Sequence, residues 1–307
     1  MPILTTDIQQ DSLFIPYRNG QLHLRHIRHT TPTALGVPIL MLHGAMSNGR
    51  VFYSDSGRGL GCFLAKAGFD IYVMDTAGRG LSEPKIHRDF TLGQGEVIRE
   101  QLPLVQQFIL QRHPLVNKVH WCAHSWGGVL MASSLARYTH LQSSVASLLT
   151  FGCKRTIKVR SLKKWLMVDF FWNRFAPFCI ARQGYFDASR FRVGMDNESS
   201  ASLLQTIDWV RGDWIDHDDN FHYAQAAAKA VWPPAWFIAG KNDHVLGNPS
   251  DVRDMIDECG FSQVKYTLLA KEKGNLLDYD HAGMLTDRQA EQDHFVQIKQ
   301  WYLSLSG

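Results

Sequence analysis

A serine stands between an apolar run and a pair of glycines in the segment A-H-S-W-G-G, residues 123–128. The apolar residues 119–123 predict a strand, and the residues after the serine predict a helix. A serine in the tight turn between such elements projects its hydroxyl above the edge of the sheet, and the turn needs small residues two positions away on either side. Ala123 and Gly127 meet that need, so Ser125 is the predicted nucleophile.

A serine hydroxyl needs a histidine as base and an acid that orients the histidine. Asp243 follows an apolar run and a glycine, which places its carboxylate at the carboxyl end of a predicted strand. His281 lies in a loop before the last predicted helix, and the spacings are 243 − 125 = 118 and 281 − 243 = 38 residues. We therefore predict Ser125, Asp243 and His281 as the catalytic residues. The alternative for Asp243 is a cap on the helix that begins near Pro249.

Three other histidines compete with His281 for the role of the base. They are His124, His244 and His294. Because neighbours at a strand end point to opposite sides, His124 is expected to point away from the nucleophile.

An acyl transfer also needs two N–H donors for the charge that develops on the carbonyl oxygen. The residue after the nucleophile, Trp126, supplies one predicted donor. A strand that ends in His-Gly at residues 43–44 supplies the other, from Ala45 or alternatively Met46.

A turn-rich segment, D-T-A-G-R-G-L-S-E-P at residues 75–84, follows another predicted strand. It lacks the glycine pattern and the helix start of a phosphate-binding loop. We expect it to brace the strand that leads to Ala45.

Short apolar runs alternate with helix-compatible stretches, which is typical of a mostly parallel sheet with crossover helices. The predicted strands are Leu22–His29, Ile39–His43, Asp70–Asp75, Lys118–His124, Ser144–Phe151, Ala235–Ala239 and Val264–Leu269. The predicted helices are Gly59–Ala67, Gly93–Arg112, Gly127–Tyr138, Pro249–Cys259 and Asp287–Leu303.

Residues 154–233 break this rhythm, with many aromatic side chains and few β-branched runs. We interpret them as a helical cap inserted into a core domain formed by residues 1–153 and 234–307. Most cap aromatics are expected in its own core, and some should line an acyl pocket. The predicted substrate contacts are His43, Met46, Trp172 and Phe175.

The composition narrows the function classes. Among 307 residues, 32 basic and 29 acidic side chains nearly cancel and are scattered, which argues against nucleic acid as a partner. The five cysteines are widely spaced, so we expect reduced core thiols and no metal site. No secretory leader is visible and no apolar run is long enough for a transmembrane segment, so a cytoplasmic protein is expected.

In chain order, H-G, D-x-x-G-R-G-x-S, A-H-S-W-G-G, G-K-N-D and D-H-A-G resemble the motifs of the α/β-hydrolase family, from about residue 20 to the C-terminus. The tail 237–284 is similar to the acid lipase branch, which carries glycine where this chain has Ala123. The resemblance implies the α/β-hydrolase fold and a hydrolase without a cofactor.

The expected function is hydrolysis of a small-molecule carboxylic ester with an apolar acyl chain. A thioesterase, an acyltransferase or another triad enzyme on the same fold remains open, as does a ligand-binding protein without catalysis. The oligomeric state is left open.

Overall fold

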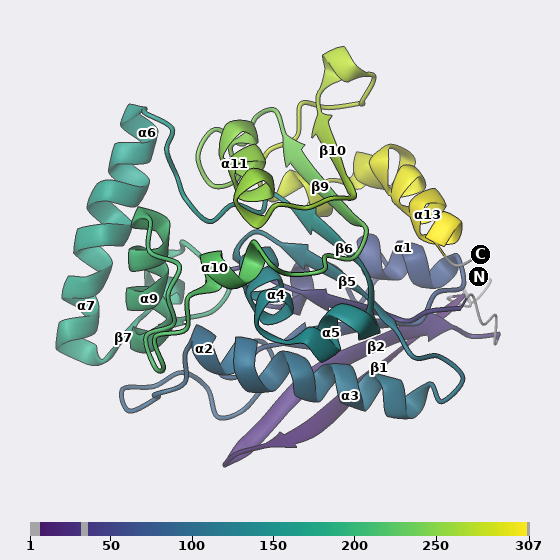
Figure 1. Ribbon diagram of the computed structural model, residues 1–307, viewed down its shortest axis with the longest axis horizontal. Coiled ribbons are helices and arrows are strands. Elements are labelled where there is room, and N and C mark those ends of the chain that lie inside the picture. The colour runs from purple at the N-terminus through teal and green to yellow at the C-terminus, as the bar shows by residue number, and fades with distance from the viewer. Residues whose placement is uncertain (1–6, 32–35, 306–307) are drawn as a thin grey trace, which may run out of the picture.

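The computed structural model describes residues 7–31 and 36–305. An eight-stranded sheet forms its centre, in the order β1-β2-β4-β3-β5-β6-β9-β10, with helices on both faces (Figure 1). Neighbouring strands are parallel except where β2 lies antiparallel to β1 and β4. The strands are β1 (Ile8–Tyr17), β2 (Gly20–His29), β3 (Ile39–Leu42), β4 (Ile71–Asp75), β5 (Val119–His124), β6 (Val145–Phe151), β9 (Ala235–Gly240) and β10 (Val264–Leu269).

The central strands are apolar on both faces because both faces are covered. Alternate side chains of one strand enter different cores: Ile39 and Met41 pack on one side of the sheet, and Leu40 and Leu42 on the other. A strand with two buried sides appears in the sequence as a continuous apolar run, which is why the sequence predicts these strands.

The helices follow the crossovers of the sheet. Helices α1 (Leu60–Lys66) and α13 (His294–Leu305) contribute to one core, and α4 (Trp126–Arg137) and α11 (Pro249–Cys259) to the other. On the α4 side, α2 (Gln94–Glu96) continues through wide turns at Val97–Gln101 into α3 (Leu102–Arg112). The shorter helices of the core are α5 (Thr139–Ser144) and α12 (Gly283–Thr286).

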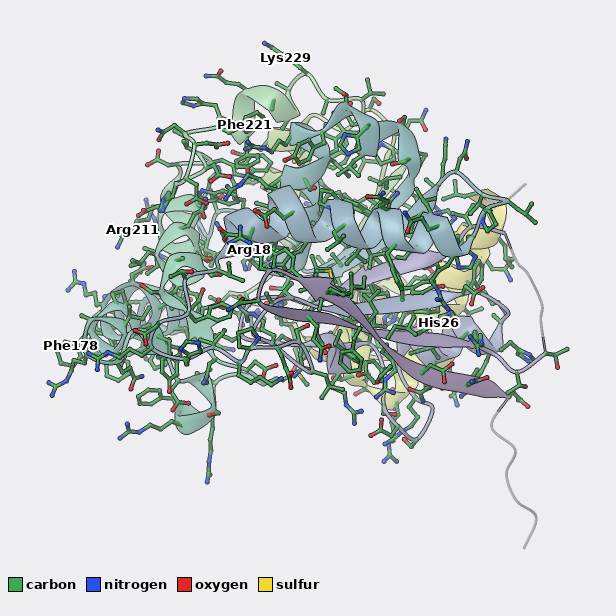
Figure 2. All side chains as sticks on the ribbon, turned by 90° about the horizontal axis from the view of Figure 1, so that it is seen from below. Arg18, His26, Phe178, Arg211, Phe221 and Lys229 are labelled. Carbon is green, nitrogen blue, oxygen red and sulfur yellow. The ribbon has the colours of Figure 1, made fainter. Side chains whose placement is uncertain are left out.

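Residues 154–233, here called the cap segment, lie between β6 and β9. They are the segment predicted from the sequence to be an inserted cap. Its longest element is one continuous helix, α6 (Leu162–Lys164), wide turns at Trp165–Phe175, and α7 (Ala176–Gln183), at the edge of the molecule (Figure 1). Phe178 of this helix lies at the outer edge, far from His26 on the sheet (Figure 2). The remaining elements are β7 (Tyr185–Phe186), α8 (Ala188–Phe191), β8 (Glu198–Ser199), α9 (Ser200–Arg211) and α10 (Tyr223–Ala227).

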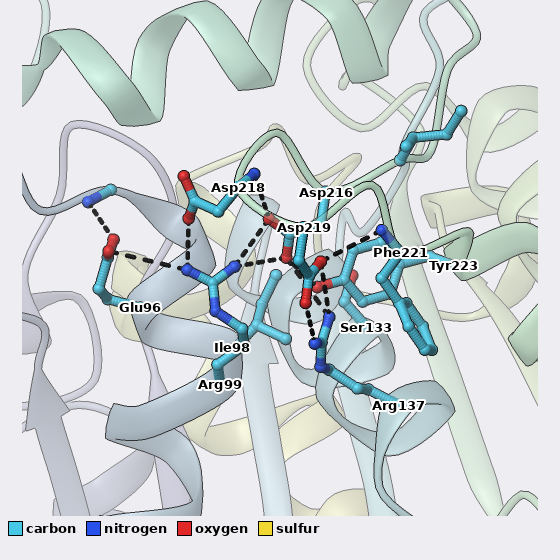
Figure 3. A network of polar contacts seen from close by, with 12 residues as sticks. Glu96, Ile98, Arg99, Ser133, Arg137, Asp216, Asp218, Asp219, Phe221 and Tyr223 are labelled. Carbon is cyan, nitrogen blue, oxygen red and sulfur yellow. Dashed lines mark hydrogen bonds and ion pairs between the residues drawn. The ribbon is translucent and has the colours of Figure 1, made fainter.

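A group of charged side chains fastens the loop between α9 and α10 to the core helices (Figure 3). We call it the arginine–aspartate cluster: Arg99, Arg137, Asp216, Asp218, Asp219 and Tyr223. Asp216 is fully buried and accepts hydrogen bonds from Arg99 at 2.7 Å and from the Tyr223 hydroxyl at 2.6 Å. The loop is thereby tied to the helix that carries Arg99.

The predicted fold class is confirmed: a mostly parallel sheet is flanked by helices. Each predicted strand has a counterpart: Val264–Leu269 matches β10 at both ends, and each of the others differs by one or two residues at one end. The edge strand β1 is absent from the prediction, and the predicted last helix is divided, with a 3₁₀ turn at Arg288–Gln292 before α13. Across residues 7–31 and 36–305, helices that combine the length and the apolar character needed to cross a bilayer are absent.

Candidate active site

The predicted nucleophile stands in a strained turn between β5 and α4. Ser125 has φ +53° and ψ −125°, a backbone conformation that residues other than glycine rarely adopt. Its N–H donates to the Phe151 carbonyl at 2.7 Å, which ties the turn to β6. Close packing requires the neighbouring glycines: a Cβ on Gly127 would lie 2.3 Å from the His43 carbonyl oxygen, and one on Gly44 would lie 2.9 Å from the Cβ of Ser125.

The predicted acid and base are hydrogen-bonded to each other. Nδ1 of His281 and Oδ2 of Asp243 are 2.5 Å apart. The two loops that carry them are joined at their bases, since Asn242 donates its N–H to the Tyr279 carbonyl at 2.9 Å and its side-chain amide to the Asp278 carbonyl at 2.9 Å. The contact between His281 and Asp243 is therefore positioned by the hydrogen bonds between the two loops and not by the two side chains alone.

Asp243 is a buried carboxylate with a lowered pKa. Burial opposes its ionisation, but the hydrogen bond and the charge of His281, with help from Lys154, outweigh burial and lower the pKa. The alternative role of Asp243 as a helix cap is filled by another residue: the Asn248 side chain accepts from the Ser250 N–H at the start of α11.

His281 lies beside the strand ends that carry the nucleophile. A Cβ on Gly152, which follows β6, would come within 2.9 Å of its Nδ1. The hydroxyl of Ser125 makes no hydrogen bond to any residue in 7–31 or 36–305, so it is free to bond the imidazole when a substrate closes the site.

None of the three competing histidines occupies this position. His294 is buried and bonds the Met284 carbonyl at 2.7 Å, and His244 is exposed. His124 bonds the backbone carbonyl of His281 through Nε2 at 3.0 Å, and the two rings are 4.7 Å apart. Burial, with the nearby charge of His281, lowers the pKa of His124 to about 3, so its ring is neutral.

The expected oxyanion donors lie where the turn that carries Ser125 meets the loop after β3. In the two described stretches of chain, neither the Ala45 N–H nor the Trp126 N–H is used in a hydrogen bond. The alternative donor, Met46, gives its N–H to the Glu198 carboxylate at 3.2 Å. Of the two candidates in this loop, Ala45 is therefore the one whose donor is available.

His43 holds in place the loop after β3 that carries Ala45, here called the oxyanion loop. Its Nε2 accepts the Thr76 N–H at 3.2 Å, and its Nδ1 donates to the Gly44 carbonyl at 2.8 Å. These bonds require the neutral ring, and burial followed by the charge of Arg79 lowers the pKa of His43 accordingly. A direct contact of His43 with substrate stays a prediction.

The turn-rich segment after β4 braces the same loop, as expected. The Asp75 carboxylate accepts the N–H groups of Gly49 at 2.7 Å and Leu81 at 2.9 Å, and bonds His23 at 2.7 Å. Burial raises the pKa of Asp75, but these partners outweigh burial and lower it, so the carboxylate stays charged between β2, β4 and the oxyanion loop.

The predicted cap contacts, Trp172 and Phe175, are partly buried. They pack with Met46 on an apolar cluster of the cap segment that includes Ile180 and Phe186. Their contact with a substrate stays a prediction.

Three buried charged side chains near the site are not predicted from the sequence. Lys154, three residues after the end of β6, has its ammonium 5.8 Å from the Trp126 ring, and burial lowers its pKa against the attraction of Asp243. Arg79 forms an ion pair with Glu198 of β8, and both side chains are buried. Only the D-x-x-G-R-G-x-S pattern marks Arg79 in the sequence, and no pattern marks Glu198.

Metal chemistry would need a cluster of ligating side chains. The described residues hold no group of three or more histidine, cysteine, aspartate or glutamate side chains that could bind a metal ion.

Comparisons with known proteins agree with the architecture. A family model described as "alpha/beta hydrolase fold" matches residues 37–182. A soluble variant of monoglyceride lipase from Saccharomyces cerevisiae has a TM-score of 0.67 at 15% identity, over 100% of this chain and 98% of that one. No curated protein matches the sequence at a significant level.

Two further solved structures are similar over almost their whole length. An esterase from Thermogutta terrifontis has a TM-score of 0.58 at 15% identity, covering 97% of this chain and 100% of that one. A thioesterase domain from the curacin biosynthetic pathway has a TM-score of 0.58 at 14% identity, covering 96% and 99%. At these identities the likeness concerns the fold.

Proposed function

We propose that this chain, which has the α/β-hydrolase fold, is a serine hydrolase that cleaves a carboxylic ester. Ser125 is the nucleophile, His281 the general base and Asp243 the residue that orients the base. The observation that carries the proposal is the 2.5 Å bond between His281 and Asp243, on loops beside the strained turn of Ser125.

In the first half of the reaction, Oγ of Ser125 attacks the ester carbonyl carbon and forms the new C–O bond. Nε2 of His281 takes the hydroxyl proton, and the Asp243 carboxylate stabilises the imidazolium. The N–H groups of Ala45 and Trp126 bind the oxyanion. The bond to the leaving alkoxide then breaks, and His281 returns the proton to it.

In the second half, water attacks the acyl-enzyme carbonyl. His281 takes a proton from this water, and the same two donors hold the second oxyanion. Collapse of the intermediate releases the carboxylic acid, and the proton on His281 returns to Ser125.

Carboxylic esters are favoured as substrates by the esterase and the lipase among the structurally similar proteins. An apolar acyl group is favoured by the side chains beside Ala45 and Trp126, which include Ile86, Phe90 and Leu130. The thioesterase domain supports a thioester as the second candidate. We further propose a small-molecule ester as the substrate, no nucleic-acid partner, and a cytoplasmic location.

The experiment is hydrolysis of p-nitrophenyl esters from acetate to palmitate by the wild type, Ser125→Ala and His281→Ala. Activity at some chain length that falls by a factor of about 10⁴ or more in both variants is the expected result. Ser304→Ala and His140→Ala, both at exposed positions, serve as matched controls and should keep wild-type rates.

Two other outcomes separate the alternatives. Wild-type turnover by Ser125→Ala would overturn the assignment of the nucleophile. Hydrolysis of acyl thioesters but of no oxygen ester would replace the ester with the thioester.

A further inference from the structure

A small cavity lies directly behind the proposed oxyanion donors. Ala45 and Trp126 are part of its wall, so a group in the cavity would be attached close to the scissile carbonyl. The open space is about 30 Å³, enough for one or two water molecules. The cavity therefore admits the tip of a short acyl group rather than a long chain.

One wall residue, Gln94, has an amide whose orientation is set by its partners. Its Oε1 accepts the indole N–H of Trp126 at 2.8 Å and the Thr206 hydroxyl at 3.1 Å. An indole N–H can only donate, so Oε1 has to face it. The Nε2 of Gln94 then has no hydrogen-bond partner in the described part of the chain, although the side chain is only 1% exposed.

In a second wall residue, Arg79, only one of the two terminal guanidinium nitrogens has a hydrogen-bond partner among the described residues. Its Nη2 pairs with Oε1 of Glu198, while its Nη1 is buried and has no hydrogen-bond partner in residues 7–31 and 36–305. The guanidinium as a whole is 7% exposed, so water does not solvate it freely.

The other amide in the wall, Gln101, accepts the Ala77 N–H through its oxygen at 3.0 Å, and its Nε2 is buried without a hydrogen-bond partner among the described residues, like that of Gln94. Two kinds of group in the cavity wall are therefore unmet: the amide nitrogens and the guanidinium of Arg79.

Both unmet groups are donors, so a group that satisfies them has to accept hydrogen bonds. A buried donor without an acceptor is unfavourable, and a ligand that supplies the acceptor gains what the empty site lacks. The charge of Arg79 is balanced by Glu198, which is 1% exposed. An uncharged acceptor suits this balanced pair better than a carboxylate, which would add a second negative charge in a buried place.

We propose that the cavity binds a second, uncharged carbonyl oxygen on the acyl group of the substrate, held by Nη1 of Arg79 and Nε2 of Gln94. The substrate class is then an ester of a short oxo-acid. This inference rests on the proposed ester hydrolysis and specifies its substrate.

The test compares three p-nitrophenyl esters with acyl chains of similar length: pentanoate, 4-oxopentanoate and the hemisuccinate. They place a methylene, a ketone and a carboxylate in the cavity. After subtraction of the rates without enzyme, kcat/KM should be about tenfold to a hundredfold higher for 4-oxopentanoate than for pentanoate. The hemisuccinate should not exceed pentanoate.

The matched variant is Gln94→Met, which has a similar size, removes the amide donor and adds no charge to the buried wall. The ratio of kcat/KM for 4-oxopentanoate over pentanoate should fall by about tenfold in this variant. Gln263→Met, at an exposed position before β10, is the control and should keep the wild-type ratio.

A second readout needs no variant. Free 4-oxopentanoate should inhibit the wild type more strongly than free pentanoate, by a similar factor. Equal kcat/KM for the two esters together with equal inhibition would overturn the inference and leave a cavity that holds only water. A preference for the hemisuccinate would replace the carbonyl with a carboxylate and overturn it as well.

Failure of the proposed function gives a different result. No turnover of any ester, with no label on Ser125 from a fluorophosphonate, would remove the proposed function and this inference together. Turnover through Ser125 without preference would remove the inference alone.

Discussion

Two buried polar regions of this molecule differ in how completely their groups are paired. In the arginine–aspartate cluster, Asp216 has no exposed surface and accepts from Arg99 and Tyr223, while Arg137 pairs with Asp219 (Figure 3). In the cavity behind the proposed oxyanion donors, Nη1 of Arg79 and Nε2 of Gln94 have no hydrogen-bond partner among the residues that the structure describes. Both regions join the cap segment to the core.

This difference in pairing indicates that the two regions have different roles. A closed set of partners stabilises one arrangement of the chain, and removing a member leaves the others buried without compensation. An open set costs stability in the free protein and is compensated when a ligand fills it. We therefore assign the cluster to holding the fold and the cavity to binding.

The largest expected effect is on the cluster. Asp216→Ala should lower the free energy of unfolding by about 3–5 kcal/mol, because Arg99 and the Tyr223 hydroxyl lose a fully buried partner. Urea denaturation followed by tryptophan fluorescence measures the change. Asp218→Ala, at a side chain that is 55% exposed, is the control and should cost less than about 1 kcal/mol. Similar losses in the two variants would mean that burial does not determine how much each aspartate of the cluster contributes to the free energy of unfolding.

The second effect concerns His124, another buried group with an unpartnered atom, Nδ1. Its pKa is about 3 in the folded protein and about 6.5 when unfolded. The unfolded chain therefore binds a proton that the folded one does not, and His124 lowers the free energy of unfolding as pH falls below about 6.5. By pH 5 this loss should reach about 2 kcal/mol.

The measurement for His124 is the free energy of unfolding at pH 7 and at pH 5. The decrease between the two should be smaller by most of that amount in His124→Gln, which has no group that titrates there. An equal decrease in the wild type and the variant would show that His124 takes up its proton without unfolding.

The smallest effect is expected in the cavity. Gln94→Met should lower the free energy of unfolding by about 1 kcal/mol, because the indole N–H of Trp126 loses its acceptor while an unpaired donor is removed at the same time. The same denaturation experiment measures it beside Asp216→Ala. A loss above about 3 kcal/mol would give Gln94 a structural role and erase the contrast between the two regions.

The central strands and the three proposed catalytic residues could be predicted because each depends on local sequence. Strands buried on both faces leave unbroken apolar runs, and Ser125, Asp243 and His281 each follow a recognisable strand or turn. The edge strand β1 could not be predicted in this way, because its buried and exposed positions are mixed and its apolar residues form no continuous run.

The cavity donors could not be predicted from spacing. Arg79 and Glu198 are 119 residues apart, and Gln94 meets Thr206 across 112 residues. Whether a buried glutamine is paired depends on the partners that the folded chain brings to it, and no single position of the sequence records that. The neutral state of His124 likewise depends on burial, which lowers its pKa and which only the folded chain supplies, and then on the nearby charge of His281, 157 residues away.

The central claim is that Ser125 is a nucleophile activated by His281. Treatment with a fluorophosphonate, followed by mass spectrometry of the tryptic peptides, tests it most directly. The account predicts one adduct, on Ser125, which forms at a rate that falls sharply in His281→Ala and not in the exposed control His140→Ala. An unlabelled Ser125, or an adduct rate that is the same in His281→Ala as in the wild type, would contradict it.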